Sequence, residues 1–177
     1  MSNFNSQKII APIMRFVNLK GIIALKDGML AILPLTVVGS LFLIIGQLPF
    51  EGLNQAIASV FGDTWTEPFM QVYSGTFAIM GLISCFSIGY SYAKNSGVEP
   101  SPSGVLSLSS YFILLKSSYV PAKGEPIGDA IAKVWFGGQG IIGAIIIGLV
   151  VGAIYTVFIQ RHIVSKIPEQ VPQAIAK

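Results

Sequence analysis

Charged and disulfide-forming residues are scarce in this sequence. Only 11% of its 177 residues are Asp, Glu, Lys or Arg, whereas about 25% is usual in a soluble domain. The single Cys85 excludes a disulfide framework and a metal site built from several cysteines. Hydrophobic residues make up 53% of the chain, and its mean hydropathy is +0.71. The composition therefore predicts an integral membrane protein, and a net charge of +3 gives no basis for nucleic-acid binding.

Four long stretches contain no Asp, Glu, Lys or Arg: 28–50, 68–93, 100–115 and 134–160. A membrane-spanning helix needs about 20 mainly apolar residues, so the first, second and fourth stretches are long enough. The third stretch crosses only if its helix continues towards Val120 and Lys116 reaches the interface. The sequence predicts an all-α membrane protein with four spans, of which the third depends on that extension.

Charges differ between the two sides of the first span. Residues 1–27 carry more Lys and Arg than acids, whereas the loop 48–67 carries acids and no base. Because basic residues concentrate on the cytoplasmic side, the N-terminus is predicted to be cytoplasmic. The Lys and Arg counts fit three or four spans equally well, so they leave the side of the C-terminus open. The spacing of Ile9, Ile13 and Phe16 predicts an amphipathic interfacial helix within residues 1–27.

Small residues recur every four positions in the last stretch. They are Gly140, Ala144, Gly148, Gly152 and Thr156. Residues four apart share one helical face, and small side chains let helices approach closely in lipid. This stripe predicts either packing within the chain or a contact between two copies. A weaker stripe of the same kind lies in the second stretch, at Gly81, Cys85, Gly89 and Ala93.

Pro34 lies inside the first stretch. Proline lacks a backbone N–H and obstructs the preceding helical turn, so the sequence predicts a kink there. Its direct neighbours are leucines, which cannot use a freed carbonyl. We therefore interpret the kink as a structural feature rather than a hinge.

Side chains that could bind a substrate are rare in the predicted spans. The spans contain no ionisable residue of the kind that marks ion and substrate pathways in membranes. Carbohydrates are held by carboxylates, amides and aromatic rings, and the sequence displays no such cluster within a span. We predict no catalytic residue, no cofactor and no metal site in this chain. His162, beside Arg161 after the last stretch, is interpreted as an interfacial basic residue.

Two motifs resemble those of a known family. Residues 19–45 read LKGIIALKDGMLAILPLTVVGSLFLII, and residues 167–177 read IPEQVPQAIAK. Both resemble the N-terminal half of enzyme IIC, the membrane component of phosphoenolpyruvate-dependent sugar phosphotransferase systems, in the branch for lactose, cellobiose and diacetylchitobiose. The matching positions are Ala24, Lys26, Asp27, Gly28, Pro34, Gly39, Ser40 and Phe42, followed by Pro168, Val171, Pro172 and Ile175.

The resemblance implies a domain organisation and a function. It implies an interfacial helix over 1–27, a four-span scaffold and dimerisation part over 28–166, and a cytoplasmic lead-in to a fifth span over 167–177. It also implies a homodimer in the bacterial plasma membrane that takes up a β-linked disaccharide, which a cytoplasmic enzyme IIB partner phosphorylates. In the family the sugar pocket belongs to the C-terminal half, so no sugar-binding or catalytic residue is carried over to this chain.

Other functions remain open from the sequence. The chain has the size of a small stand-alone substrate-binding membrane subunit of a vitamin-type uptake system, although its spans lack polar pocket residues. It is also compatible with a structural or regulatory fragment that associates with an intact permease. An autonomous enzyme is least favoured, because the titratable groups fall in loops rather than in a water-excluded site.

Overall fold

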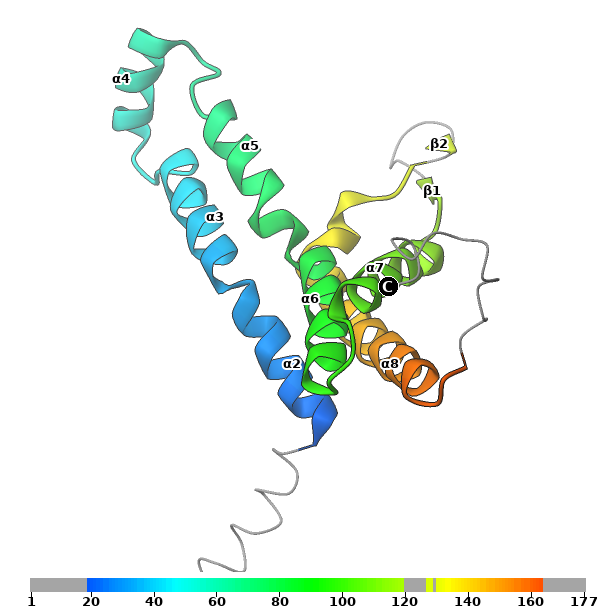
Figure 1. Cartoon of the computed structure of the whole chain (residues 1–177). Helices are drawn as coiled ribbons and strands as arrows, with labels where there is room; N and C mark the ends of the chain where they lie inside the picture. The colour runs from blue at the N-terminus through cyan, green and yellow to red at the C-terminus, as the bar shows by residue number, and fades with distance from the viewer. Residues whose placement is uncertain (1–18, 120–126, 129, 164–177) are drawn as a thin grey trace, which may run out of the picture.

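The computed structural model of the protein describes residues 19–119, 127–128 and 130–163. These residues form a helical structure (Figure 1). The elements are α2 (Lys20–Ala31), α3 (Leu33–Gly46), α4 (Glu51–Phe61), α5 (Glu67–Gly75), η1 (Phe77–Ile79), α6 (Met80–Asn95), α7 (Pro100–Leu114), β1 (Ser118–Tyr119), β2 (Ile127–Gly128), η2 (Lys133–Phe136), η3 (Gly138–Gly140) and α8 (Ile141–Gln160). The helical fold class is confirmed, with one addition, because β1 and β2 pair as two-residue antiparallel strands.

Three helices in the described part of the chain are long and apolar enough to cross a membrane: Lys20–Gly46, Glu67–Asn95 and Gly138–Gln160. They correspond to the first, second and fourth predicted spans. The first begins at Lys20 rather than at residue 28, so the predicted boundary between residues 27 and 28 falls inside α2. Most of the interfacial helix predicted for 1–27 lies outside the described residues.

The third predicted span is shorter than its prediction required. α7 ends at Leu114, and Leu115 has extended backbone angles of φ −79° and ψ 138°. The predicted helical extension towards Val120 is wrong, because the chain leaves the helix and then pairs as strands β1 and β2. With 15 residues, α7 measures about 22 Å, which is less than the hydrocarbon thickness of about 30 Å.

α2 and α3 form one long rod with a break at Ile32 (Figure 1). Pro34 is in the first turn of α3, where its missing N–H has no intrahelical acceptor to lose. The N–H of Thr36 donates to the carbonyl of Ile32 at 3.0 Å and starts the new helix. The kink predicted at Pro34 is therefore present as a break between two helices.

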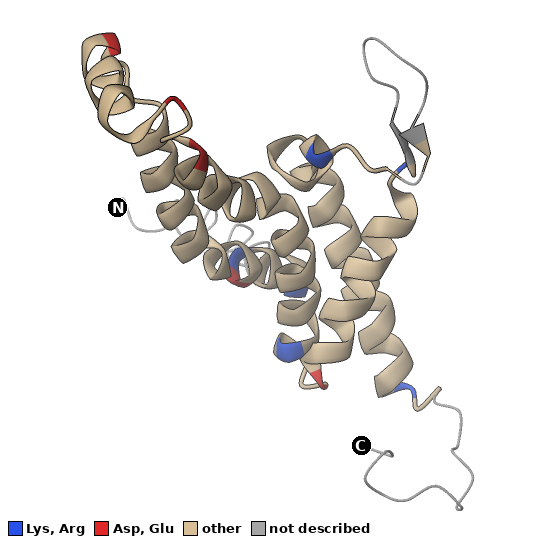
Figure 2. Cartoon of the chain, turned by 90° about the horizontal axis from the view of Figure 1, so that it is seen from above, with Lys and Arg blue, Asp and Glu red and all other residues tan. Residues whose placement is uncertain are grey.

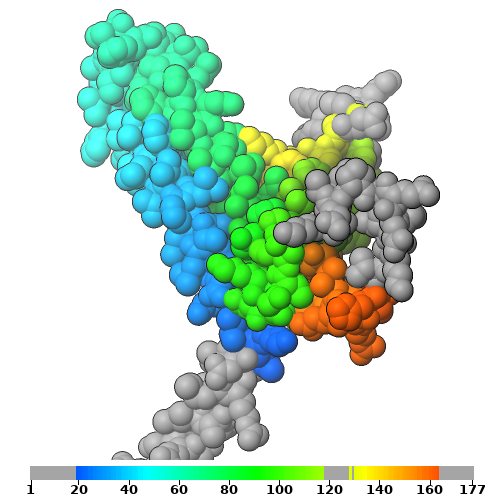
Figure 3. Space-filling view, viewed as in Figure 1, coloured from blue at the N-terminus to red at the C-terminus, as the bar shows by residue number. Residues whose placement is uncertain are grey.

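α6 lies at the centre of a bundle and contacts α2, α7 and α8 (Figures 1 and 3). Glycines bring these helices together. A Cβ added to Gly28 of α2 would lie 2.7 Å from the Cα of Ile88 in α6, and one added to Gly148 of α8 would lie 2.9 Å from the carbonyl oxygen of Cys85. Lipid provides little hydrophobic drive between helices, so this close packing is what holds the bundle together.

α3, α4 and α5 form an arm that extends away from the bundle (Figure 3). α3 packs along α5, and Gly39 fits against Phe77 and Thr76, where an added Cβ would lie 2.6 Å from the Thr76 Oγ1. The other side of α3 is exposed and apolar, with Leu33, Val37, Leu41 and Ile44 uncovered. An apolar surface of this kind suits lipid or another membrane helix rather than water.

Charged residues gather towards the ends of the helices (Figure 2). The acids Glu51, Asp63 and Glu67 lie in and around α4. Lys94 and Arg161 lie at the other end, next to a contact in which the Gln160 Nε2 of α8 donates to the Ser96 carbonyl at 3.0 Å. The acids around α4 and the bases Lys94 and Arg161 thus lie at opposite ends of the helices.

Candidate functional site

A polar cleft of about 380 Å³ lies between α2 and α6, at the end of the bundle that carries Lys94. Its lining combines a carboxylate, an amide, an ammonium group, hydroxyls and aromatic rings. The lining residues are Asp27 and Ala31 of α2 and Phe86, Ser87, Tyr90, Ser91, Lys94 and Asn95 of α6. This mixture is uncommon for a helix contact inside a membrane protein, where polar groups are costly unless they have partners.

The α6 wall of the cleft consists of two parallel rows of side chains. Residues four apart stack along one face of a helix. One row is Phe86, Tyr90 and Lys94, and the other is Ser87, Ser91 and Asn95. From Ser87 to Asn95 the rows extend about 12 Å along the helix. An aromatic row therefore runs beside a row of hydroxyl and amide groups.

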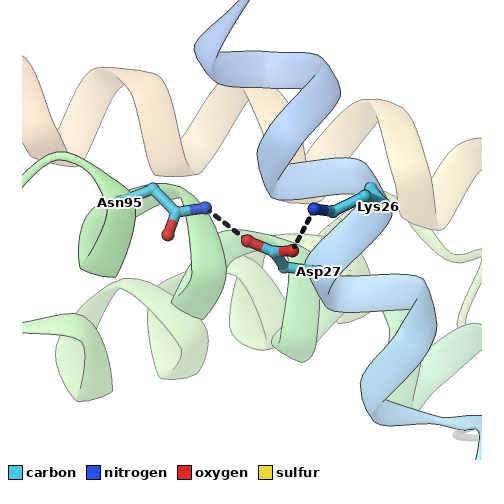
Figure 4. Close-up of polar contacts among 3 residues, drawn as sticks. All are labelled: Lys26, Asp27 and Asn95. Carbon is cyan, nitrogen blue, oxygen red and sulfur yellow. Dashed lines mark hydrogen bonds and ion pairs between the residues drawn. The ribbon is translucent and has the colours of Figure 1, made fainter. Parts of the chain in front are cut away.

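Asp27 faces α6 from the opposite wall (Figure 4). Its Oδ2 accepts a hydrogen bond of 2.9 Å from the Asn95 Nδ2, and its Oδ1 lies 3.2 Å from the Lys26 Nζ. The neighbouring Gly28 permits this geometry, because a side chain there would collide with Ile88. The Asp-Gly pair of the first motif thus combines a polar contact with the close approach of two helices.

Ser87 and Ser91 give the cleft its buried polar groups. Their relative exposures are only 9% and 8%, and both line the cleft. Neither hydroxyl is among the fully buried side-chain atoms that lack a hydrogen-bond partner, which in the described residues are the Asn54 Oδ1, the Ser96 Oγ and the Thr156 Oγ1. The Ser84 hydroxyl, which does not line the cleft, donates to its own helix at Met80 O, 2.6 Å away. Because both serines line the cleft, their hydroxyls offer donors and acceptors to an occupant that can hydrogen-bond.

Packing against α7 supports the aromatic row. The rings of Phe86 and Tyr90 are stacked, with centroids 6.0 Å apart and an interplanar angle of 26°. Gly104 of α7 leaves room for the Phe86 ring, since a Cβ at Gly104 would lie 2.7 Å from that ring. α7 thus fixes the aromatic surface that the cleft presents.

The small-residue stripe of α8 does not line this cleft. Its members Gly140, Ala144, Gly148, Gly152 and Thr156 are all buried. A Cβ at Gly152 would lie 2.8 Å from the Tyr92 Cβ of α6. In the described structure, Gly148 and Gly152 therefore face α6 of the same chain, whereas Gly140 faces Trp135 and Tyr111. The weaker stripe of α6 is buried as well.

The other motif residues have local or structural contacts. The Ser40 hydroxyl donates to its own helix at Val37 O, 2.9 Å away. Pro168, Val171, Pro172 and Ile175 lie outside the described residues. His162 is exposed just beyond α8, away from the cleft-lining set.

The cleft offers groups that can bind a polar ligand. Its lining includes no His or Cys that could act as a nucleophile or general base near neutral pH. Among the described residues, no group of three or more His, Cys, Asp or Glu could hold a metal ion. The arrangement offers hydrogen bonds, an ion pair and stacked rings, which together can hold a polar ligand.

The sequence analysis did not identify this cleft. The spacing of Phe86, Tyr90 and Lys94 is visible in the sequence, as is that of the serines beside them. However, the carboxylate comes from α2, and its pairing with Asn95 spans 68 positions. Only the packing of α2 on α6 brings the components together.

Comparisons with known proteins identify the family. The model of the phosphotransferase system EIIC family matches residues 26–177. The chain belongs to the EIIC family. The resemblance inferred from the two motifs is therefore confirmed.

Similar proteins include several EIIC components. The lichenan permease IIC component of Bacillus subtilis (strain 168) is 38% identical over 160 residues, which are 87% of this chain and 35% of that protein. The cellobiose-specific EIIC component of Geobacillus stearothermophilus is 35% identical over 160 residues, again 87% of this chain and 35% of that protein. This EIIC chain spans about a third of the length of these curated relatives.

A solved structure supports the same assignment. The crystal structure of the transporter ChbC, the IIC component of the N,N'-diacetylchitobiose-specific phosphotransferase system, matches with a TM-score of 0.86 at 31% identity. The match covers 98% of this chain and 41% of ChbC. The helical arrangement of this EIIC chain is therefore that of part of a sugar-system transporter.

Proposed function

We propose that this EIIC chain is the N-terminal half of a permease that takes up a β-linked disaccharide and couples uptake to its phosphorylation. The main observation in support of this proposal is the match to ChbC, which covers 98% of this chain. Relatives named for lichenan and cellobiose support the class of sugar. In this proposal a cytoplasmic enzyme IIB phosphorylates the sugar, and the principal sugar pocket belongs to the C-terminal half.

The chain supplies the scaffold of that permease. Gly28 and Gly148 bring α2 and α8 into backbone contact with α6, and such contacts leave little freedom for sliding. A scaffold of this kind gives a moving, sugar-carrying half a fixed surface to move against.

We propose four membrane crossings, with α7 as the third. The Tyr111 hydroxyl near the end of α7 donates to the Gly140 carbonyl at the start of α8, 3.2 Å away. α7 begins at Pro100, close in sequence to the Ser96 that contacts the end of α8. α7 therefore runs between the same two ends as α8. Its outward residues Val105, Leu106, Ile113 and Leu114 are exposed and apolar, which fits contact with lipid in a locally thinned bilayer.

We further propose that the N-terminus lies in the cytoplasm of a bacterial cell. The Asp27–Asn95 and Gln160–Ser96 hydrogen bonds bring Lys26, Lys94 and Arg161 to one end of the bundle. The acids around α4 lie at the other end. This division follows the positive-inside rule when the basic end is cytoplasmic.

A homodimer is the proposed assembly. Gly148 and Gly152 of the α8 stripe are covered by α6, so we look to another surface for the contact between copies. The exposed apolar side of α3, which includes Val37, Leu41 and Ile44, offers such a surface. We propose that α3 contributes to the dimer interface.

A chimeric permease tests the proposed function. In the chimera, this chain takes the place of the matching 160-residue part of the cellobiose-specific EIIC component of Geobacillus stearothermophilus. The chimera is expressed in a bacterium that has no cellobiose permease of its own but supplies the other phosphotransferase components. We expect phosphotransferase-dependent uptake of labelled cellobiose.

Two controls make the result decisive. The host permease without the replaced part should give no uptake, and the intact host permease should give full uptake. A chimera that is inserted in the membrane at the level of the intact permease yet takes up no cellobiose would contradict the proposal. Expressing the two parts as separate chains repeats the test without a fused junction.

A further inference from the structure

We propose that the α2–α6 cleft is an additional carbohydrate-binding site on the scaffold half, and that it takes a neutral disaccharide at the end assigned to the cytoplasm. This inference rests on the proposed function for the identity of its ligand. It goes beyond the proposed function because it gives the scaffold a direct contact with sugar.

The charges of the cleft favour a neutral ligand. Lys94 and Asp27 both line it and carry opposite charges. Asp27 already accepts from Asn95 and pairs with Lys26, so it remains a local negative charge. A phosphate dianion in this space would meet that carboxylate, whereas a polyol meets both charges as hydrogen-bond partners.

The serine hydroxyls of the cleft favour a polyol in particular. Ser87 and Ser91 are each more than nine-tenths buried and line the cleft. Each hydroxyl can donate one hydrogen bond and accept others. The hydroxyls of a pyranose have the same dual capacity, so a sugar can satisfy both serines at once. An acyl chain would leave them unsatisfied, at a cost in binding free energy.

The aromatic row provides the other half of carbohydrate recognition. The apolar C–H face of a pyranose ring stacks on aromatic rings, and Phe86 and Tyr90 present a stacked pair beside the serines. The cleft volume of about 380 Å³ lies within the range of about 300–1,000 Å³ that is typical of small-ligand sites. The two rows extend about 12 Å along α6, which is long enough for two pyranose rings.

The direct test is binding of cellobiose to the full 177-residue chain in phosphatidylcholine nanodiscs. Saturation-transfer NMR and titration calorimetry measure proximity and affinity. We expect weak, saturable binding. The Ser87→Ala, Ser91→Ala double variant and the Tyr90→Ala variant should each raise the dissociation constant at least about fivefold, as loss of ligand hydrogen bonds and of the stacking surface predicts.

Matched control variants exclude general effects of substitution. Tyr73→Ala removes a ring from the stacked Tyr73–Phe77 pair of α5, whose centroids are 5.6 Å apart. Ser59→Ala removes an exposed α4 hydroxyl that bonds only to its own helix. Both variants should bind cellobiose like the original chain. Circular dichroism and thermal melting of every variant establish that the helices remain folded.

Several results would overturn the inference. No saturable binding by the folded chain would do so, and so would binding that depends on Tyr73 but not on Tyr90. A third such result would be occupation of the cleft by a lipid. If phosphatidylglycerol abolished cellobiose binding, and its 31P resonance shifted with the original chain but not with the Lys94→Gln variant, the cleft would belong to a lipid headgroup.

The chimera separates the two proposals. Cellobiose uptake by the chimera without binding by this chain would leave the proposed function standing and refute only the carbohydrate site in the cleft.

Discussion

The Asn95 Nδ2 donates a 2.9 Å hydrogen bond to the Asp27 Oδ2, joining the last residue of α6 to the Asp-Gly pair of α2. Both residues line the polar cleft, and Figure 4 shows the bond between them. Gly28, which follows Asp27 in the sequence, packs on Ile88. A polar clamp and a close backbone contact therefore act on the same pair of helices.

The Asn95→Ala variant should loosen this clamp. Both partners are partly exposed, so we expect a loss of about 1 kcal/mol or less in the free energy of unfolding. A double-mutant cycle with Asp27→Ala isolates the contribution of this contact. The stability of each variant is measured by thermal unfolding of the chain in detergent. Additive effects of the two substitutions would show that the hydrogen bond contributes nothing to stability.

Gly28→Ala should be far more damaging than its size suggests. Its new Cβ would lie 2.7 Å from the Ile88 Cα, a backbone atom that cannot move aside by rotation. We expect about 1–3 kcal/mol of destabilisation, the usual cost of overpacking. Gly52→Ala in α4 is the matched control, since nothing lies within 4 Å of its Cβ position. Equal melting temperatures for the two variants would contradict the packing argument.

Much of the fold could be predicted from the sequence because it depends on composition and local chemistry. Long uncharged stretches indicated the three membrane-capable helices of the described residues, and Pro34 indicated the break near Ile32. α7 ends at Leu114, close to the end of its uncharged stretch, but the strand pairing of Ser118 and Tyr119 that follows in place of a helical extension could not be predicted in this way.

The polar cleft could not be predicted for a related reason. Its serines and aromatic rings are unremarkable in a span taken alone. Asp27 lies at the edge of the first stretch and gains its significance only from contact with Asn95. A site shared between helices far apart in the sequence requires knowledge of which faces pack together.

Gly148→Ala tests the contact between α8 and α6. The added Cβ would lie 2.9 Å from the Cys85 carbonyl oxygen, so we expect about 1–3 kcal/mol of destabilisation. Gly143→Ala provides the control, because its Cβ would meet only the Tyr111 ring at an ordinary 3.8 Å. Alanine's higher helix propensity should leave that variant equal or more stable. If Gly148→Ala melted like Gly143→Ala, the stripe would not serve packing within the chain.

Tyr111→Phe tests the attachment of α7 to the start of α8. The Tyr111 hydroxyl lies 2.5 Å from the Trp135 carbonyl oxygen and 3.2 Å from the Gly140 carbonyl oxygen. Its loss leaves acceptors without a donor, and we expect about 1–3 kcal/mol of destabilisation. In a Trp65→Phe background, Trp135 fluorescence should report loosening of η2 at temperatures below global unfolding. Coincident fluorescence and helical transitions, both unshifted from the original chain, would argue against this role.

Thr156→Val, unlike Tyr111→Phe, should not destabilise the chain. The Thr156 hydroxyl is buried at 3% relative exposure and has no hydrogen-bond partner among the described residues. Valine has nearly the same shape without the unpaired polar group, so stability should stay equal or rise. Ser103→Ala is the contrasting variant, because the buried Ser103 hydroxyl donates to the Gly89 carbonyl oxygen at 2.7 Å. Its loss should cost about 1–3 kcal/mol. A destabilised Thr156→Val chain in the thermal melt would mean that the hydroxyl has a partner in the folded protein.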